Sequence, residues 1–272
     1  MPKAREIAVL RRHTGSNIVT LILPGFNQDG EVLRDILAPG LAGSDIICYR
    51  LPRWGFDQQA LIEAVNDVRS YRHVAVYAES AGALDAAALL RAYPELIVDQ
   101  LILNGGMGSW EDANAGRLLQ LSRIVPGWLL PNALLRSNQR KAVANSPALD
   151  PGVDKVLVRR AEQNSIGLTG RQVIGEMRRM VQTLPIRDRE FAGRVGNVVY
   201  IGAPGEHNEL AESDTLVKLR RACDRWFRAV DFQGTIVLPP TWTEGHMRLH
   251  APPEKPGLVI HELRLAINRS LA

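Results

Sequence analysis

The sequence has few cysteines and no long apolar run. Only Cys48 and Cys223 occur among its 272 residues, and they lack the spacing of metal ligands. Two cysteines cannot form a disulfide framework, so we expect a reducing, cytoplasmic environment. No stretch reaches the about 18 apolar residues that a membrane-spanning helix needs. Residues 1–6 carry charges with no apolar stretch behind them, so no secretory signal is expected either.

Aromatic residues are also scarce, and the net charge is small. Aromatics make up 6% of the chain, and 33 Lys and Arg against 29 Asp and Glu give a net charge of +4. No basic run is interleaved with aromatics, so no nucleic-acid partner is expected. Residues 111–194 hold 14 Lys and Arg against 8 Asp and Glu. This local excess either attracts an anionic substrate or surface through its long-range field or forms a solvated helical face.

The sequence does contain an alternation of short apolar runs and helical patterns. Strands are predicted over residues 18–23, 45–49, 73–78 and 98–103, with helices over 31–37, 57–69 and 81–93 between them. Such an alternation is typical of an α/β fold, a mostly parallel, doubly wound sheet with helices on both faces.

The alternation stops after the fourth predicted strand. Residues 107–189 show helical patterns and no convincing strand, and the apolar residues at 173, 174, 177, 180, 181 and 184 recur at helical spacing. About eighty such residues are too many for a crossover connection, so they are predicted to form an inserted helical cap. The core then comprises residues 1–106 and 190–272, with a strand at 197–201, a helix at 209–230, a strand at 235–238 and a helix at 257–271.

One serine lies between a predicted strand and a predicted helix, in the sequence Ala78-Glu-Ser-Ala-Gly82. A serine in such a turn is held in a strained, exposed position at the carboxyl edge of the sheet. Small neighbours at Ala78 and Gly82 let the turn close, and the Ala81 N–H at the helix start faces any oxyanion formed beside Ser80. Ser80 is therefore the candidate nucleophile, although alanine replaces the first glycine of the G-x-S-x-G pattern.

With this motif the sequence resembles the α/β-hydrolase-fold serine hydrolases, esterase- or lipase-like enzymes with a helical cap. The resemblance covers nearly the whole chain except the cap. The loop Leu23-Pro-Gly-Phe26 resembles the family's loop that supplies a second oxyanion N–H, which implies this role for Phe26. Thr243-Glu-Gly-His246 resembles the Gly-His that carries the family's base. His246 also follows Ser80 by 166 residues, consistent with the order serine, acid, histidine.

Two other histidines compete with His246 for the role of base. His207 and His250 also lie near the predicted edge of the site, and His250 is four residues from His246. No carboxylate-rich third ligand accompanies the pair, so we expect no metal and interpret His246 as the base.

The acid of the triad has several candidates. The resemblance implies an acid just after the strand at 197–201, where residues 201–210 read Ile-Gly-Ala-Pro-Gly-Glu-His-Asn-Glu-Leu. One alignment places Asn208 there, and an amide cannot carry the charge that stabilises the imidazolium. A second alignment places Glu206, whose extra methylene relative to Asp gives it more reach. Glu209 and Asp214 are further candidates, and Glu206 is preferred.

The remaining predictions concern substrate and chemistry. Asn27, Trp54, Met107 and Trp110 occupy loops at the same predicted edge, which favours a pocket for a small apolar or acyl substrate. Trp128 either lines this pocket or joins the cap to the core. The resemblance implies a cofactor-free serine hydrolase that cleaves esters or thioesters through an acyl-enzyme. Acyl transfer, carbon–carbon cleavage and cofactor-independent peroxidation use the same parts, and a ligand-binding protein with a lost acid is the alternative.

Overall fold

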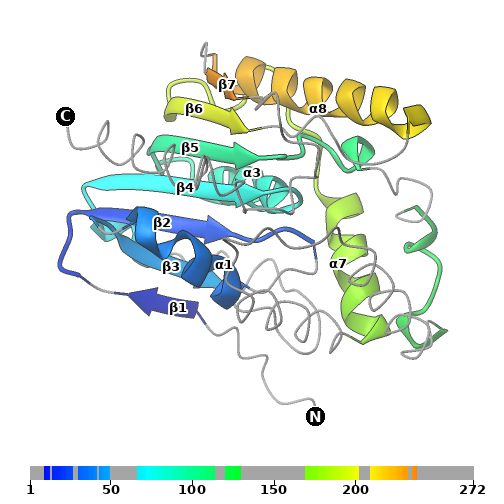
Figure 1. The fold of residues 1–272 in the computed structure, drawn as a ribbon, viewed down its shortest axis with the longest axis horizontal. Helices are drawn as coiled ribbons and strands as arrows, with labels where there is room; N and C mark the ends of the chain where they lie inside the picture. Colours follow the sequence, from blue (N-terminus) through cyan, green and yellow to red (C-terminus); the bar gives the residue numbers. More distant parts are fainter. Residues whose placement is uncertain are drawn as a thin grey trace.

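The computed structural model of the chain (Figure 1) describes most of the core and part of the predicted cap. It describes residues 9–12, 14–26, 30–41, 43–49, 66–113, 120–129, 169–201, 209–231 and 235–237. The strands are β1 (Val9–Arg12), β2 (Ile18–Leu23), β3 (Asp45–Tyr49), β4 (His73–Glu79), β5 (Val98–Asn104), β6 (Val195–Ile201) and β7 (Thr235–Val237). They form one sheet in the order β1-β3-β2-β4-β5-β6-β7, as far as the described residues show.

The inner strands are parallel and buried on both faces, as the sequence predicts. All six residues of β2 are buried, because helices cover both sides of the sheet. β1, which was not predicted from the sequence, pairs antiparallel with β3 at one edge. Its short Val-Leu-Arg-Arg sequence lacks the apolar run that marks the other strands. The strand before the predicted cap is consequently the fifth, β5, rather than the fourth.

Helices pack on both faces of this sheet. The described helices are α1 (Gly30–Leu37), α3 (Gly82–Ala92), α7 (Gly170–Gln182) and α8 (Glu209–Val230), with 3₁₀ turns η1 (Ala38–Leu41), η2 (Asn66–Ser70), η3 (Trp110–Asp112) and η4 (Gly127–Leu129). α3 and α8 share one apolar cluster with the sheet, and α1 shares another on the opposite face. The α/β class is therefore confirmed. The end of the helix predicted over 57–69 is the 3₁₀ turn η2, and its first residues lie outside the described ranges.

α7 occupies a different position, beyond the carboxyl ends of the parallel strands (Figure 1). Thr169 begins it with a capping box, in which the Thr169 hydroxyl accepts from the Gln172 N–H and the Gln172 side chain accepts from the Thr169 N–H. Its apolar face packs against Ala81 and Leu84 at the start of α3. The predicted helix in this segment is thus confirmed. Between β5 and β6, the described residues contain helices and turns and no strand.

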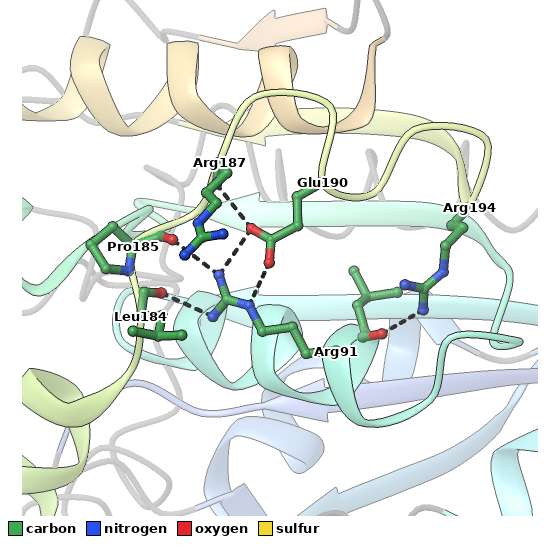
Figure 2. Close-up of polar contacts among 7 residues, drawn as sticks. Arg91, Leu184, Pro185, Arg187, Glu190 and Arg194 are labelled. Atoms are coloured by element: carbon green, nitrogen blue, oxygen red, sulfur yellow. Dashed lines mark hydrogen bonds and ion pairs between the residues drawn. The ribbon is translucent and has the colours of Figure 1, made fainter.

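The chain returns from α7 to the sheet along the end of α3 (Figure 2). Arg91, in the last turn of α3, donates through Nε to Glu190 Oε1 at 2.6 Å and through Nη2 to Glu190 Oε2 at 3.0 Å. The same guanidinium donates to the carbonyls of Leu184 at 2.9 Å and Pro185 at 3.1 Å. Because one planar group holds three points of the returning segment, it fixes the path into β6.

Candidate active site

The turn that carries Ser80 has an unusual backbone. Ser80 has a φ of +49°, in the left-handed region that residues other than glycine seldom adopt. Hydrogen bonds on both sides hold it there. The Ser80 N–H donates to the Asn104 carbonyl at 2.9 Å, and the Ser80 carbonyl accepts from the N–H groups of Ala83 at 3.2 Å and Met107 at 3.1 Å. The turn therefore carries a strain that neighbouring strands and loops stabilise.

Gly82 explains how the next loop approaches this turn. A Cβ at Gly82 would lie 2.2 Å from the Leu23 carbonyl oxygen and 2.8 Å from that of Pro24. Only glycine leaves room for the backbone after β2 to cross the start of α3. The close approach places the loop of Phe26 against the loop of Ser80.

Backbone donors lie at the meeting point of these two loops. Ala81 precedes α3 with helical dihedrals and has no side-chain cap. Within the described part of the chain, the N–H groups of Ala81 and Phe26 donate to no acceptor. Unpaired N–H groups beside a helix N-terminus can bind an anion or a developing oxyanion.

An apolar cluster surrounds this point. Ala81 and Leu84 pack with α7, and Phe26, Met107 and Trp110 lie partly buried against the same cluster. The structure thus brings together two of the predicted pocket residues and both predicted oxyanion donors. Ser80 itself is only 6% exposed, so the prediction of an exposed serine is wrong. The loop of Met107, bonded to the Ser80 carbonyl, and the apolar cluster lie close around it.

The loop after β5, which carries Met107, is anchored to the core from three sides. The Tyr200 hydroxyl donates to the Gly106 carbonyl at 2.9 Å, and Trp226 Nε1 donates to the Met107 carbonyl at 3.0 Å. The Gly108 carbonyl accepts from a backbone N–H of the segment after α7. Asp112 accepts from two N–H groups of this loop, and burial raises its pKa despite the charge of Arg225. The loop is therefore a rigid wall of the site.

A buried carboxyl group, for which no role was predicted from the sequence, directly precedes the serine. Glu79 is fully buried, and its Oε2 accepts from the Tyr77 hydroxyl at 3.1 Å. Asn104 Nδ2 donates to the Tyr77 oxygen at 2.9 Å. Burial, followed by the charge of Glu79, raises the pKa of Tyr77 well above its usual value, so Tyr77 remains a neutral donor. A charged residue inside an apolar strand was the sequence signal for this network.

A second buried charge cluster, which was not predicted from the sequence, joins α3 to α7. Arg179 Nη1 donates to Asp85 Oδ1, and Arg179 Nη2 lies 3.7 Å from Glu176 Oε1. The side chains of Asp85 and Arg179 are only 2% and 6% exposed. Asp85 lies one turn along the helix that begins beside Ser80, so the cluster links α7 directly to the candidate site.

Several predicted residues lie where the structure gives no test. Asn27, Trp54, Glu206, Asn208 and His246 lie outside the described residues, as do His207 and His250. Glu209 and Asp214 belong to α8, and nothing is described of their side chains. Trp128 is 70% exposed, so both roles predicted for it, lining the pocket and joining cap to core, are wrong. The 3₁₀ turn that contains it, η4, packs on the outer side of α7 instead (Figure 1).

No protein-family model matches the sequence, and no curated protein does. Solved structures do match over almost the whole chain. A bromoperoxidase from Bacillus anthracis has a TM-score of 0.66 at 15% identity, covering 99% of this chain and 96% of its own. A thermophilic esterase from Thermogutta terrifontis has 0.63 at 14%, covering 100% and 96%. MenH from S. aureus has 0.62 at 12%, covering 98% and 99%. The chain has the α/β-hydrolase fold.

In this fold, β4, β5 and β6 end at the same level on the carboxyl edge of the sheet. Glu79 pairs with Asn104, and Asn104 pairs with Ile201 at the end of β6. Ile201, at the end of β6, therefore lies two strand spacings, about 10 Å, from the end of β4 beside Ser80. No helix among the described residues has both the length and the apolar character that crossing a membrane requires.

Proposed function

We propose that the chain is a serine hydrolase that cleaves an ester, thioester or related acyl substrate, with Ser80 as nucleophile. The observation that carries the proposal is the strained backbone of Ser80, at φ +49° between β4 and α3. Such strain persists where surrounding structure enforces it and is concentrated at functional sites. The nearby N–H groups of Ala81 and Phe26 would stabilise the negative charge that develops on the substrate's carbonyl oxygen.

In the proposed mechanism, His246 accepts the hydroxyl proton as Ser80 Oγ attacks the substrate carbonyl carbon. The carbonyl oxygen becomes an oxyanion and accepts hydrogen bonds from the N–H groups of Phe26 and Ala81. His246 then returns the proton to the leaving group, and an acyl-enzyme remains. A water molecule, deprotonated by His246, releases the acid and restores Ser80. Glu206 orients His246 and stabilises its charged form.

The apolar surroundings favour a small apolar or acyl substrate. Phe26, Met107 and Trp110 pack in the cluster beside Ala81, and Asn27 and Trp54 are proposed to complete the pocket. Residues 107–189 are proposed to form the cap that closes it, with α7 as its inner helix. Both cysteines are buried and neither forms a disulfide, which fits the proposed cytoplasmic location.

The experiment that tests the nucleophile is labelling with a fluorophosphonate, which reacts with activated serines. We expect the unchanged chain to be modified at Ser80, as mapped by peptide mass spectrometry, because His246 and the two N–H groups activate that hydroxyl. Ser80→Ala should remain folded and unlabelled. Modification of another serine, or no modification of a folded sample, would contradict the proposal.

The acid requires a separate test. The support for Glu206 is that it follows a strand, β6, whose last residue Ile201 pairs with Asn104, two strand spacings from the end of β4 beside Ser80. Glu206→Gln should lower turnover of a short-chain ester by about four orders of magnitude, as an amide in this position does in serine proteases. Glu209→Gln and Asp214→Asn are the matched controls and should change turnover little. Near-normal turnover in Glu206→Gln would exclude this acid, and a chain without any such acid would favour the ligand-binding alternative.

A further inference from the structure

The segment before η4 and η4 itself expose large apolar side chains. Leu121, Ile124, Trp128 and Leu129 are 50%, 76%, 70% and 52% exposed. Only two other large apolar side chains of the described residues are as exposed, and both lie elsewhere in the chain. We call these four residues the outer apolar surface. Four such side chains within nine residues are unusual on a protein surface and mark a site of interaction.

The outer apolar surface rests on a fixed support. Arg178 of α7 donates through Nε to the Ser122 carbonyl at 2.7 Å and through Nη2 to the Val125 carbonyl at 2.8 Å. A Cβ at Gly127 would lie 2.8 Å from Arg171 Cα, so the turn is packed closely on α7. Figure 1 shows this segment on the far side of α7 from the sheet. The exposure is therefore a property of an anchored segment.

On the two described segments that form and support this surface, the exposed charges have one sign. Arg123 and Arg171 are exposed, and Arg178 is half-buried. In the two described segments 120–129 and 170–182, the only acidic residue is Glu176, which is buried beside Arg179. The exposed charge of these segments is therefore entirely positive. Arginine and tryptophan beside aliphatic side chains form the combination that binds at the interface of an anionic lipid bilayer.

We propose that the outer apolar surface docks on a membrane that contains anionic phospholipid. Trp128, Ile124 and their apolar neighbours enter the boundary between headgroups and acyl chains, and Arg123 and Arg171 pair with lipid phosphates. A second copy of the chain fits less well. A two-fold contact through this surface would bring the arginines of one copy close to those of the other.

This docking would leave the candidate active site separated from the bilayer by α7 and the docked segment. The inner face of α7 packs on Ala81 and Leu84, and the segment that carries the outer apolar surface packs on α7 from the other side. The docking does not depend on the proposed hydrolase chemistry. Ser80→Ala should therefore bind vesicles as the unchanged chain does, even where it is not labelled by a fluorophosphonate.

Co-sedimentation of the full chain with vesicles tests the proposal. We expect binding to vesicles of phosphatidylcholine mixed with phosphatidylglycerol, and weaker binding to phosphatidylcholine alone. The double variant Ile124→Ser/Trp128→Ser should bind the mixed vesicles at least about tenfold less, because it removes most of the inserted apolar area. Arg123→Gln should weaken binding and reduce its dependence on salt. Ile97→Ser, at an apolar residue 60% exposed just before β5, is the matched control and should bind normally.

Three outcomes would overturn the proposal. The unchanged chain fails to bind the mixed vesicles, or the double variant binds them equally well, or Ile97→Ser weakens binding as much as the double variant does. A chain that ignores vesicles but forms a dimer, which the double variant dissociates on size exclusion, would identify a second copy as the occupant instead. A circular dichroism spectrum of each variant checks that it is folded, which we expect because the substituted side chains are exposed.

Discussion

The two ends of α3 are both tied to the segment between β5 and β6, but by contacts of different kinds. At the first turn, beside Ser80, Asp85 pairs with Arg179 where both side chains are almost completely buried. At the last turn, Arg91 pairs with Glu190 where the side chains are 23% and 21% exposed. In both pairs the residue on α3 has the charge that the helix dipole favours. Asp85 is an acid near the N-terminus, and Arg91 is a base near the C-terminus.

The difference lies in what replaces each contact when it is lost. Water can reach the groups around Arg91, so a broken pair there is partly solvated. Water has little access to Asp85 and Arg179, so removing either residue would leave the other charge buried without this partner. The buried pair beside the candidate nucleophile therefore constrains where α7 packs on α3. The partly exposed pair at the other end holds the segment before β6, and its loss should destabilise the fold less.

The largest expected effect is at the buried end. Asp85→Ala should lower the free energy of unfolding by about 3–5 kcal/mol, because the buried Arg179 loses the carboxylate that it contacts across the two helices. The measurement is urea unfolding followed by circular dichroism. The triple variant Asp85→Leu/Glu176→Gln/Arg179→Met removes the charges together and should recover most of this loss. A loss below about 1 kcal/mol in Asp85→Ala would show that water enters this end of α3 as well.

The other end should respond less. Arg91→Met removes the bidentate pair with Glu190 and two hydrogen bonds to carbonyls, and we expect a loss of about 2 kcal/mol in the same unfolding measurement. Arg189→Met is the control, since Arg189 pairs with Asp231 at 3.1 Å with both side chains more than half exposed. It should cost less than about 1 kcal/mol. An equal loss in Arg91→Met and Asp85→Ala would remove the distinction between the two ends.

The sequence predicted local features of this fold well. The strands over residues 18–23 and 45–49 have the predicted bounds, because a strand buried on both faces needs an uninterrupted apolar run. The turn at Ser80 was identified because its backbone requires small residues at fixed neighbouring positions, above all Gly82. β1 was not predicted, because a four-residue edge strand leaves no such run.

The contacts that the sequence did not predict join distant positions. Asp85 and Arg179 are 94 residues apart, and a helical pattern gives no indication of which charged residue is buried or of its partner. The same applies to the network of Glu79, Tyr77 and Asn104, which spans two strands. Trp128 shows the reverse case. An aromatic residue in the predicted cap was expected to face inward, but only the packing of its segment on the outer side of α7 shows that it does not.

The smallest expected effect is the pH dependence of the stabilisation by the Arg91–Glu190 pair at the last turn of α3. Burial acts to raise the pKa of Glu190, but hydrogen bonds and charges from Arg91 and Arg187 outweigh it and lower the pKa below 4.5. The folded chain therefore holds the Glu190 carboxylate ionised at a pH where the unfolded chain begins to bind a proton. The resulting stabilisation is fully present above about pH 5 and is lost as the pH falls through the folded pKa.

The difference in unfolding free energy between the unchanged chain and Glu190→Gln measures this stabilisation. It should be constant between about pH 6 and pH 8 and shrink by less than about 1 kcal/mol toward pH 3, because the pair is partly exposed. In the Arg91→Met background the shrinkage should largely disappear, since Arg91 is the main group that lowers the pKa of Glu190. A difference that grows as the pH falls would mean that burial of the Glu190 carboxyl, rather than its pairing with Arg91, dominates at this end of α3.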